Sequence, residues 1–187
     1  SLGAIAAFGD GFGMAVALDH DDFLVGAPQA DGGVGAVFYF RKEGDAWVEK
    51  QVLSPDSPVS TADGAFGSAV SMRGGFALVG APYDGEAALF AGAAYYFALN
   101  GGQWEQKQKL TGLGPGVDAA SLSEAGFGSA VAISELALVV GAQYENFGST
   151  TLEGSASVFA RAQPDDEFLP VKKYTRESPF GYEFVGC

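Results

Sequence analysis

The chain has 187 residues, of which 48% are hydrophobic and 28 are glycine, enough for one domain with a sizeable core. Its 23 acidic and 10 basic residues give a formal net charge of −13, which argues against binding to nucleic acid or to an anionic membrane surface. The single cysteine, Cys187, excludes an intrachain disulfide, and no apolar run approaches the roughly 20 residues that span a bilayer.

Two short motifs recur three times along the chain. The first is a Phe-Gly pair that opens an apolar segment, and the second is Val-Gly-Ala, which Pro follows in two of the copies. Both motifs recur with steps of 54 and 61 residues, and matching steps in two separate motifs indicate a true internal repeat. The Phe-Gly copies begin at Phe12, Phe66 and Phe127, and the Val-Gly-Ala copies begin at Val25, Val79 and Val140.

Each repeat contains four apolar segments bounded by turn residues. The segments are short and rich in β-branched and aromatic residues, which predicts strands. The first two of each repeat almost lack charge and are expected to be inner strands covered on both faces, whereas the fourth alternates and suits an outer strand. The expected strands are 12–18, 23–28, 35–40 and 47–53 in the first repeat, 66–72, 76–82, 92–97 and 104–110 in the second, and 127–133, 136–143, 154–159 and 168–174 in the third.

Four antiparallel strands graded from buried to exposed describe one blade of a β-propeller, a unit that must stack on its neighbours to bury both faces. We therefore predict an all-β chain in which residues 1–187 form a single β-propeller region. Its blades are expected at 12–53, 66–110 and 127–174, with residues 180–187 as the start of a further blade.

The order Phe-Gly-x-x-Val, Val-Gly-Ala-Pro, Gly-Ala-x-Tyr-x-Phe and Trp-x-x-x-Gln-x-Leu resembles the FG-GAP repeats, which build the β-propeller of integrin α-subunits and of many secreted proteins. The resemblance covers residues 12–175 and all three repeats. It implies a ring of about seven blades. Because three blades and a stub do not close such a ring, we expect a larger propeller, completed either by a longer chain or by another chain.

In integrin-like repeats the hairpin between the first two strands carries an aspartate-rich calcium loop. The corresponding hairpins in this chain are short, at 19–22, 73–75 and 134–135. Calcium takes about six to eight oxygen ligands, and two of the three hairpins lack that set of carboxylates. The resemblance is therefore to the short, calcium-free repeat. We expect no metal and no cofactor, with calcium at the hairpin 19–22 as the less favoured alternative.

The connections between second and third strands, and from one blade to the next, lie on the same face of a propeller. Here these loops are the more variable ones. Five of them, 29–34, 54–65, 83–91, 111–126 and 144–153, carry nine carboxylates without any Lys or Arg. Variable loops on a rigid scaffold often bind partners, although acidic loops can also serve only solubility. We predict an acidic face that docks a basic protein partner or divalent cations. Its candidate binding residues are Asp31, Tyr83, Asp84, Glu86, Asp118, Tyr144, Glu145 and Phe147.

Signals for catalysis are weak, because the only histidine, His20, lies in a short hairpin and no phosphate-binding loop or zinc cluster is present. We predict a non-enzymatic interaction or structural module at the cell surface or outside the cell, with an organelle lumen or the periplasm as the alternative. Two other functions stay open. One is a lectin-like propeller that stacks glycans on Tyr83, Tyr144 and Phe147, and the other is an accessory propeller of a larger hydrolase.

Overall fold

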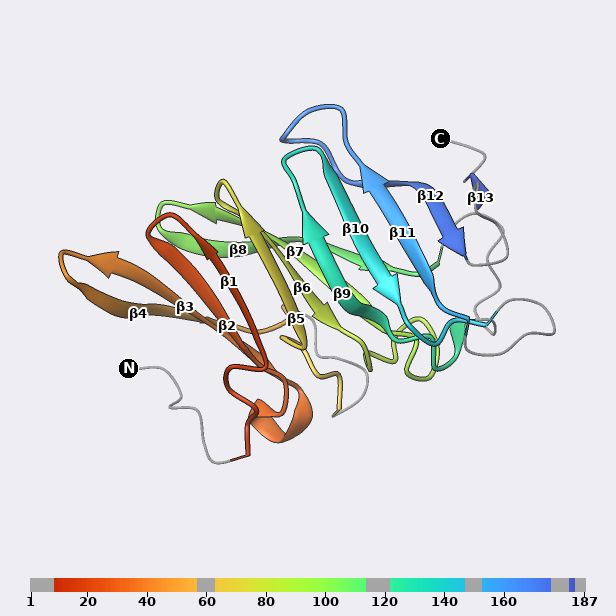
Figure 1. Cartoon of the computed structure of the whole chain (residues 1–187), viewed down its shortest axis with the longest axis horizontal. Helices are drawn as coiled ribbons and strands as arrows, with labels where there is room; N and C mark the ends of the chain where they lie inside the picture. Colours follow the sequence, from red (N-terminus) through yellow and green to blue (C-terminus); the bar gives the residue numbers. More distant parts are fainter. Residues whose placement is uncertain (1–8, 57–62, 114–121, 147–152, 176–181, 184–187) are drawn as a thin grey trace.

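Three β-sheets lie side by side in chain order in the computed structural model (Figure 1). The structure describes residues 9–56, 63–113, 122–146, 153–175 and 182–183. In every sheet consecutive strands pair antiparallel, which confirms the all-β prediction and the four-stranded blade. The described sheets form an open row and do not close into a ring.

The strands of each sheet follow one another in sequence. The first sheet contains β1 (Ala15–Asp19), β2 (Asp22–Ala27), β3 (Ala36–Glu43) and β4 (Ala46–Leu53), with a short 3-10 helix, Ala30–Gly33, between β2 and β3. The second contains β5 (Ala69–Arg73), β6 (Phe76–Ala81), β7 (Ala93–Asn100) and β8 (Gln103–Thr111). The third contains β9 (Phe127–Ile133), β10 (Ala137–Ala142), β11 (Ser155–Ala160), β12 (Leu169–Thr175) and β13 (Tyr182–Glu183).

Two details differ from the sequence-based expectation. The described part of 180–187, expected to begin a further blade, is β13, which pairs with the outer strand β12 of the third sheet. The expectation that first strands are covered on both faces is wrong for β1, whose Val16 and Leu18 are 69% and 68% exposed. In the described structure the first sheet has a neighbouring sheet on one face only, so the other face of β1 stays open.

Consecutive blades approach one another backbone to backbone at glycines of the repeated motifs. A Cβ atom on Gly26 would lie 2.0 Å from the carbonyl oxygen of Gly67, and one on Gly80 would lie 1.9 Å from that of Gly128. Neither Gly26 nor Gly80 has a positive φ, so it is the close approach, and not the backbone conformation, that requires glycine there. The Val-Gly-Ala motif of one blade thus receives the Phe-Gly motif of the next, which explains why both motifs recur with the same steps.

Parallel β-bridges reinforce this contact. Gly35 bridges to Phe66 and Gly92 to Phe127, in each case between the entry to a third strand and the Phe-Gly pair of the following blade. The side chains of Phe66 and Phe127 are thereby fully buried. A blade junction therefore combines a close backbone contact with an aromatic anchor.

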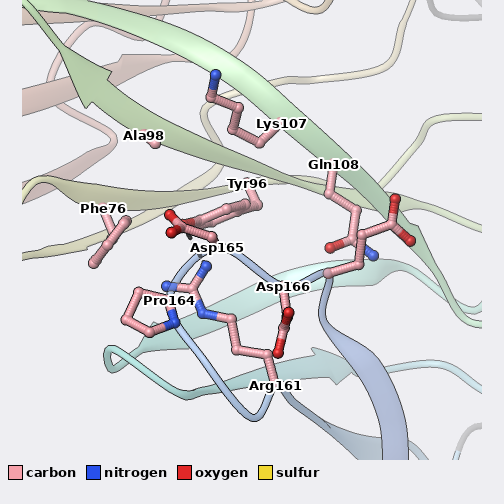
Figure 2. Close-up of a pocket in the computed structure, with 10 residues that line it drawn as sticks. Phe76, Tyr96, Ala98, Lys107, Gln108, Arg161, Pro164, Asp165 and Asp166 are labelled. Carbon is pink, nitrogen blue, oxygen red and sulfur yellow. Dashed lines mark hydrogen bonds between the residues drawn. The ribbon is translucent and has the colours of Figure 1, made fainter.

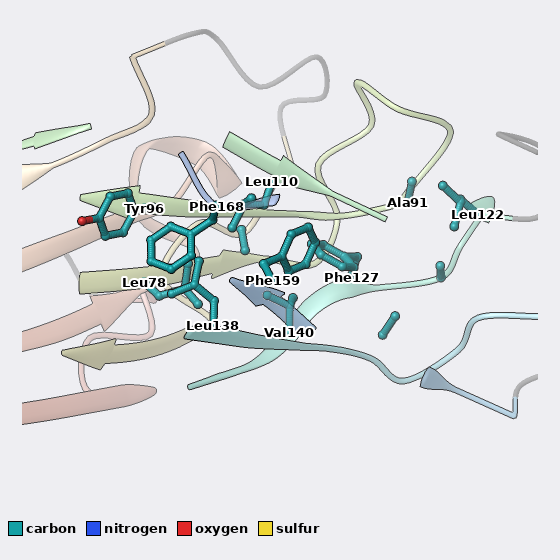
Figure 3. Packing of buried hydrophobic residues seen from close by; sticks show 13 residues of the cluster. Leu78, Ala91, Tyr96, Leu110, Leu122, Phe127, Leu138, Val140, Phe159 and Phe168 are labelled. Carbon is teal, nitrogen blue, oxygen red and sulfur yellow. The ribbon is translucent and has the colours of Figure 1, made fainter. Parts of the chain in front are cut away.

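Apolar side chains fill the space that the backbone contacts define. Tyr39 and Trp104 meet edge to face between the first and second sheets, with ring centroids 5.7 Å apart. Tyr96 and Phe168 meet in the same way between the second and third, at 5.0 Å, within the cluster of Figure 3. These buried aromatic pairs contribute stability beyond that of their buried area.

The glutamine of the fourth-strand motif also crosses the junction. The Gln51 side chain accepts from the backbone N–H of Trp104 at 2.7 Å and donates to its carbonyl oxygen at 2.9 Å. Gln108 makes the same two bonds with Phe168, at 2.9 and 2.8 Å. The Trp-x-x-x-Gln spacing in the sequence therefore reflects a contact between blades and not one within a blade.

We expect Gly80→Ala to lower the free energy of unfolding by at least about 2 kcal/mol, because its Cβ would collide with backbone that cannot move without separating two blades. Urea unfolding in dilute protein measures the change. Gly141→Ala is the matched control, since a Cβ there meets only Ala130 Cβ, at 3.4 Å. Equal losses in the two variants would contradict the role given to the backbone contact.

Candidate functional site

The described parts of the links between second and third strands and between blades gather at one end of the sheets, away from the β1–β2, β5–β6 and β9–β10 hairpins (Figure 1). Backbone hydrogen bonds tie these links together. The N–H of Glu124 donates to Leu89 at 2.8 Å, and that of Tyr144 donates to Ala125 at 3.0 Å. The described part of this loop face is therefore a connected surface and not a set of independent loops.

Four of the eight predicted binding residues lie exposed on this face. They are Asp31, Tyr83, Glu86 and Tyr144, and the two tyrosines are each 44% exposed. The Tyr83 ring is held edge to face against Phe90, with centroids 6.0 Å apart. Tyr83 and Tyr144 thus present part of each ring to solvent from a fixed backbone.

Two other predicted residues are buried. Asp84 is 1% exposed and Glu145 is 2% exposed, so neither belongs to an open acidic surface, which corrects the placement expected from the sequence. Asp118 and Phe147 lie outside the described residues.

Asp84 is neutralised by groups from neighbouring strands. Lys109 Nζ lies 2.9 Å from its Oδ2, and the Tyr95 hydroxyl donates to the same oxygen at 2.5 Å. The other oxygen accepts the backbone N–H of Glu86 at 2.9 Å, and Lys109 also pairs with the Glu86 carboxylate. Burial, followed by the hydrogen bond to Asp84, raises the pKa of Tyr95 well above its ordinary value. Tyr95 therefore stays a neutral donor to this carboxylate at physiological pH.

Glu145 has an equivalent arrangement one blade later. Lys173 Nζ lies 2.5 Å from its Oε1, and the Ser155 hydroxyl donates to its Oε2. The two lysines lie on β8 and β12 and not in the loops. Counting charges loop by loop therefore misses them.

The sequence did carry a signal for these pairs. Lys109 and Lys173 each stand five residues after the aromatic that opens a fourth strand, and the first repeat has Val52 at that position. The residues that correspond to Asp84 and Tyr95 in the first repeat are Ala30 and Phe38, which are buried in an apolar cluster with Val52 packed against it. Acid and lysine are thus present together or absent together, as expected for buried partners.

We expect Lys109→Val to lower the free energy of unfolding by about 3 kcal/mol, because it leaves the buried Asp84 without its cation. The triple change Asp84→Ala, Tyr95→Phe and Lys109→Val reproduces the first repeat and should recover most of that loss. Chemical denaturation of both variants measures the difference. A triple variant as unstable as the single one would show that the three positions do not act as a set.

The described exposed residues around Tyr83 combine apolar and acidic side chains. We call them the loop-face patch. Leu89 and the two tyrosines supply the apolar surface, and the carboxylates are distributed among them. The patch consists of Asp63, Tyr83, Glu86, Leu89, Glu124 and Tyr144.

A pocket of about 340 Å³ opens between the second and third sheets (Figure 2). At its base Arg161, buried except for 7% of its surface, donates from Nη1 to the Tyr96 hydroxyl at 2.9 Å and from Nε to the Glu135 carbonyl at 2.9 Å. Its guanidinium lies 4.3 Å from the Phe168 ring centroid and 4.8 Å from that of Phe76. Burial raises the pKa of Tyr96.

These contacts indicate a structural role for Arg161, a residue that the sequence alone did not point to. Two hydrogen bonds and the faces of the Phe76 and Phe168 rings hold the Arg161 guanidinium at the junction. Cation–π contacts of this kind are attractive. Asp165, Asp166 and Glu167 also line the pocket, together with Lys107. We therefore assign Arg161 and the base of this pocket to the packing of the second and third blades.

Within the described ranges, no group of three or more His, Cys, Asp or Glu is placed to hold a metal ion. Those ranges also contain no helix long and apolar enough to cross a membrane.

A family model described as FG-GAP repeat matches residues 47–97 and 104–159, more than half of the chain. Each match begins at or near the start of a fourth strand and ends in the third strand of the following sheet, so each spans one blade junction. A comparison with curated proteins found no match.

Proposed function

Because the chain belongs to the FG-GAP repeat family, we propose that it is a protein-interaction module that docks a basic partner through the loop-face patch. FG-GAP repeats build propeller-type interaction modules and are typically not catalytic. The proposal makes this chain a binding scaffold, with the blades as its rigid part and the linked loops as its contact surface.

The observation that carries the proposal is the composition of the loop-face patch. Exposed Tyr83, Leu89 and Tyr144 can be desolvated by a partner, and buried aromatic and aliphatic anchors supply most of the affinity in protein interfaces. Glu86 and Glu124 lie among them and favour a cationic partner during encounter. Asp84 and Glu145 are buried beneath this patch. Their ion pairs with Lys109 and Lys173 hold the loops in place, and neither acid contacts the partner.

We place this module in an extracellular, cell-surface or lumenal assembly. The support is the resemblance of all three repeats to those of secreted and integrin-like propellers. The net charge of −13 suits a partner with a basic surface.

We expect Tyr83→Ala combined with Tyr144→Ala to weaken binding to a basic partner at least about tenfold, because the pair removes two anchors. A panel of lysine- and arginine-rich peptides, screened by biolayer interferometry on the immobilised chain, supplies the probe. Glu86→Gln with Glu124→Gln should reduce the association rate and flatten its dependence on salt.

Leu136→Ala is the matched control, because Leu136 is also 44% exposed but lies in the β9–β10 hairpin at the opposite end of the sheets. Absence of binding across the panel, or an equal loss in the control, would contradict the proposal. Glycan-array binding that disappears in the Tyr83 variant would favour the lectin function in its place.

A further inference from the structure

The first blade carries an unused copy of the Phe-Gly contact. Phe66 and Phe127 are 0% and 1% exposed because each is seated against the preceding blade, whereas Phe12 is 49% exposed. A Cβ on Gly13 would meet nothing within 4 Å, although Gly67 and Gly128 each lie against backbone of the preceding blade. Among the residues that the structure describes, one half of a blade junction therefore has no counterpart at this end of the row.

The third blade carries the other half. Gly141 corresponds to Gly26 and Gly80, but a Cβ there would meet only Ala130, at 3.4 Å. Its φ is not positive, so no contact and no backbone conformation in the described structure requires glycine at this position. Glycine inside a strand is destabilising and marks either a bulge or the close approach of another backbone. The pairing of β10 with β9 shifts in register between Gly141 and Ala142, whereas Gly26 and Gly80 have no such shift and each lies against the backbone of the next blade.

A hollow lies where that approach would occur. It has a volume of about 470 Å³ and is lined by Gly141, Gly154, Ser155 and Tyr174, among others. Gly154 corresponds to Gly35 and Gly92, which bridge to the next Phe-Gly pair, and the described residues show no such bridge for it. Glu153 also lines the hollow, and its Oε2 is buried without a partner within the described structure.

The surfaces around both free halves are apolar. On the first blade we define the first-blade face as Phe12, Met14, Val16 and Leu18, all of them exposed. Beneath them lie the buried Ala30 and Phe38, which stand where the second blade has Asp84 and Tyr95. On the third blade we define the third-blade face as Val139, Leu169 and Tyr174, also exposed. Apolar faces of this kind on a soluble protein mark contact sites.

The outer strand of the third blade differs from the other two at one junction position. Lys172 stands where Gln51 and Gln108 cross the two internal junctions to the backbone of Trp104 and Phe168. By the same correspondence, Lys172 faces the position that Trp47 would take in a following blade.

We propose that a second copy of this chain docks head to tail, with Phe12 and Gly13 of one copy seated against Gly141 and Gly154 of the other. The contact continues the two junctions inside the chain and uses the same pair of motifs. It is heterologous, so an open row of any length keeps one free half of each kind, one at each end, until a ring closes. The association does not involve the loop-face patch and is independent of the proposed binding function.

Sedimentation velocity of the 187-residue chain tests the proposal. We expect a concentration-dependent mass at multiples of 19.2 kDa. Gly141→Ala should weaken association at least about tenfold through backbone collision, and Val16→Asp should do the same by placing a charge in the first-blade face. Both positions are open in the single chain, so the unfolding midpoint in dilute protein should stay unchanged. Leu89→Asp, on the loop face, is the control that should still associate.

Mixing the two variants gives the decisive measurement. Gly141→Ala retains a working first-blade face and Val16→Asp retains a working third-blade face, so an equimolar mixture should form a dimer with one intact junction. A wild-type chain that stays monomeric up to about 0.1 mM, or a mixture that stays monomeric, would overturn the proposal. So would a loss of stability in Gly141→Ala as large as in Gly80→Ala, because another segment of the same chain would then occupy the site.

Discussion

The contact of one blade's strand with the carbonyl of the next blade's Phe-Gly pair sets the geometry of the whole molecule. At Gly26 and Gly80 there is no room for even one carbon atom, since a Cβ would lie 2.0 and 1.9 Å from that oxygen. Because the backbones meet directly, the spacing between sheets does not depend on which side chains fill the rest of the junction. The aromatic pairs and the crossing glutamines occupy a gap whose width the glycines have already determined.

The side chains beside these contacts vary between repeats, whereas the glycines do not. The face that a blade turns toward the preceding blade holds Asp84, Tyr95 and Lys109 in the second blade and only apolar side chains in the first, beside which the described structure has no preceding blade. Such an exchange is tolerated when all members change together, whereas the loss of one partner leaves a buried charge.

The all-β fold with its four-stranded antiparallel sheets could be predicted from the sequence because the two motifs recur in phase and each marks one end of a backbone contact. The burial of Asp84 and Glu145 did not follow, since their lysines come from strands distant in the chain and only a comparison between repeats links them. Arg161 was missed for a similar reason, because its aromatic partners lie on another sheet as well as its own. Residues that act across a junction are visible in the sequence only when the repeats are aligned with one another.

The third repeat offers the most informative comparison. It departs from the other two at several positions that carry side-chain contacts, with Gln143 in place of proline and Lys172 in place of glutamine. It nevertheless keeps Gly141, at the position where the backbone of the next blade comes close to Gly26 and Gly80. A side chain at a junction can be replaced by another that fills the same space. A glycine at a backbone contact cannot be replaced, because any Cβ atom would collide with the neighbouring backbone. The retained glycine is therefore a stronger indication of a contact than any of the side chains around it.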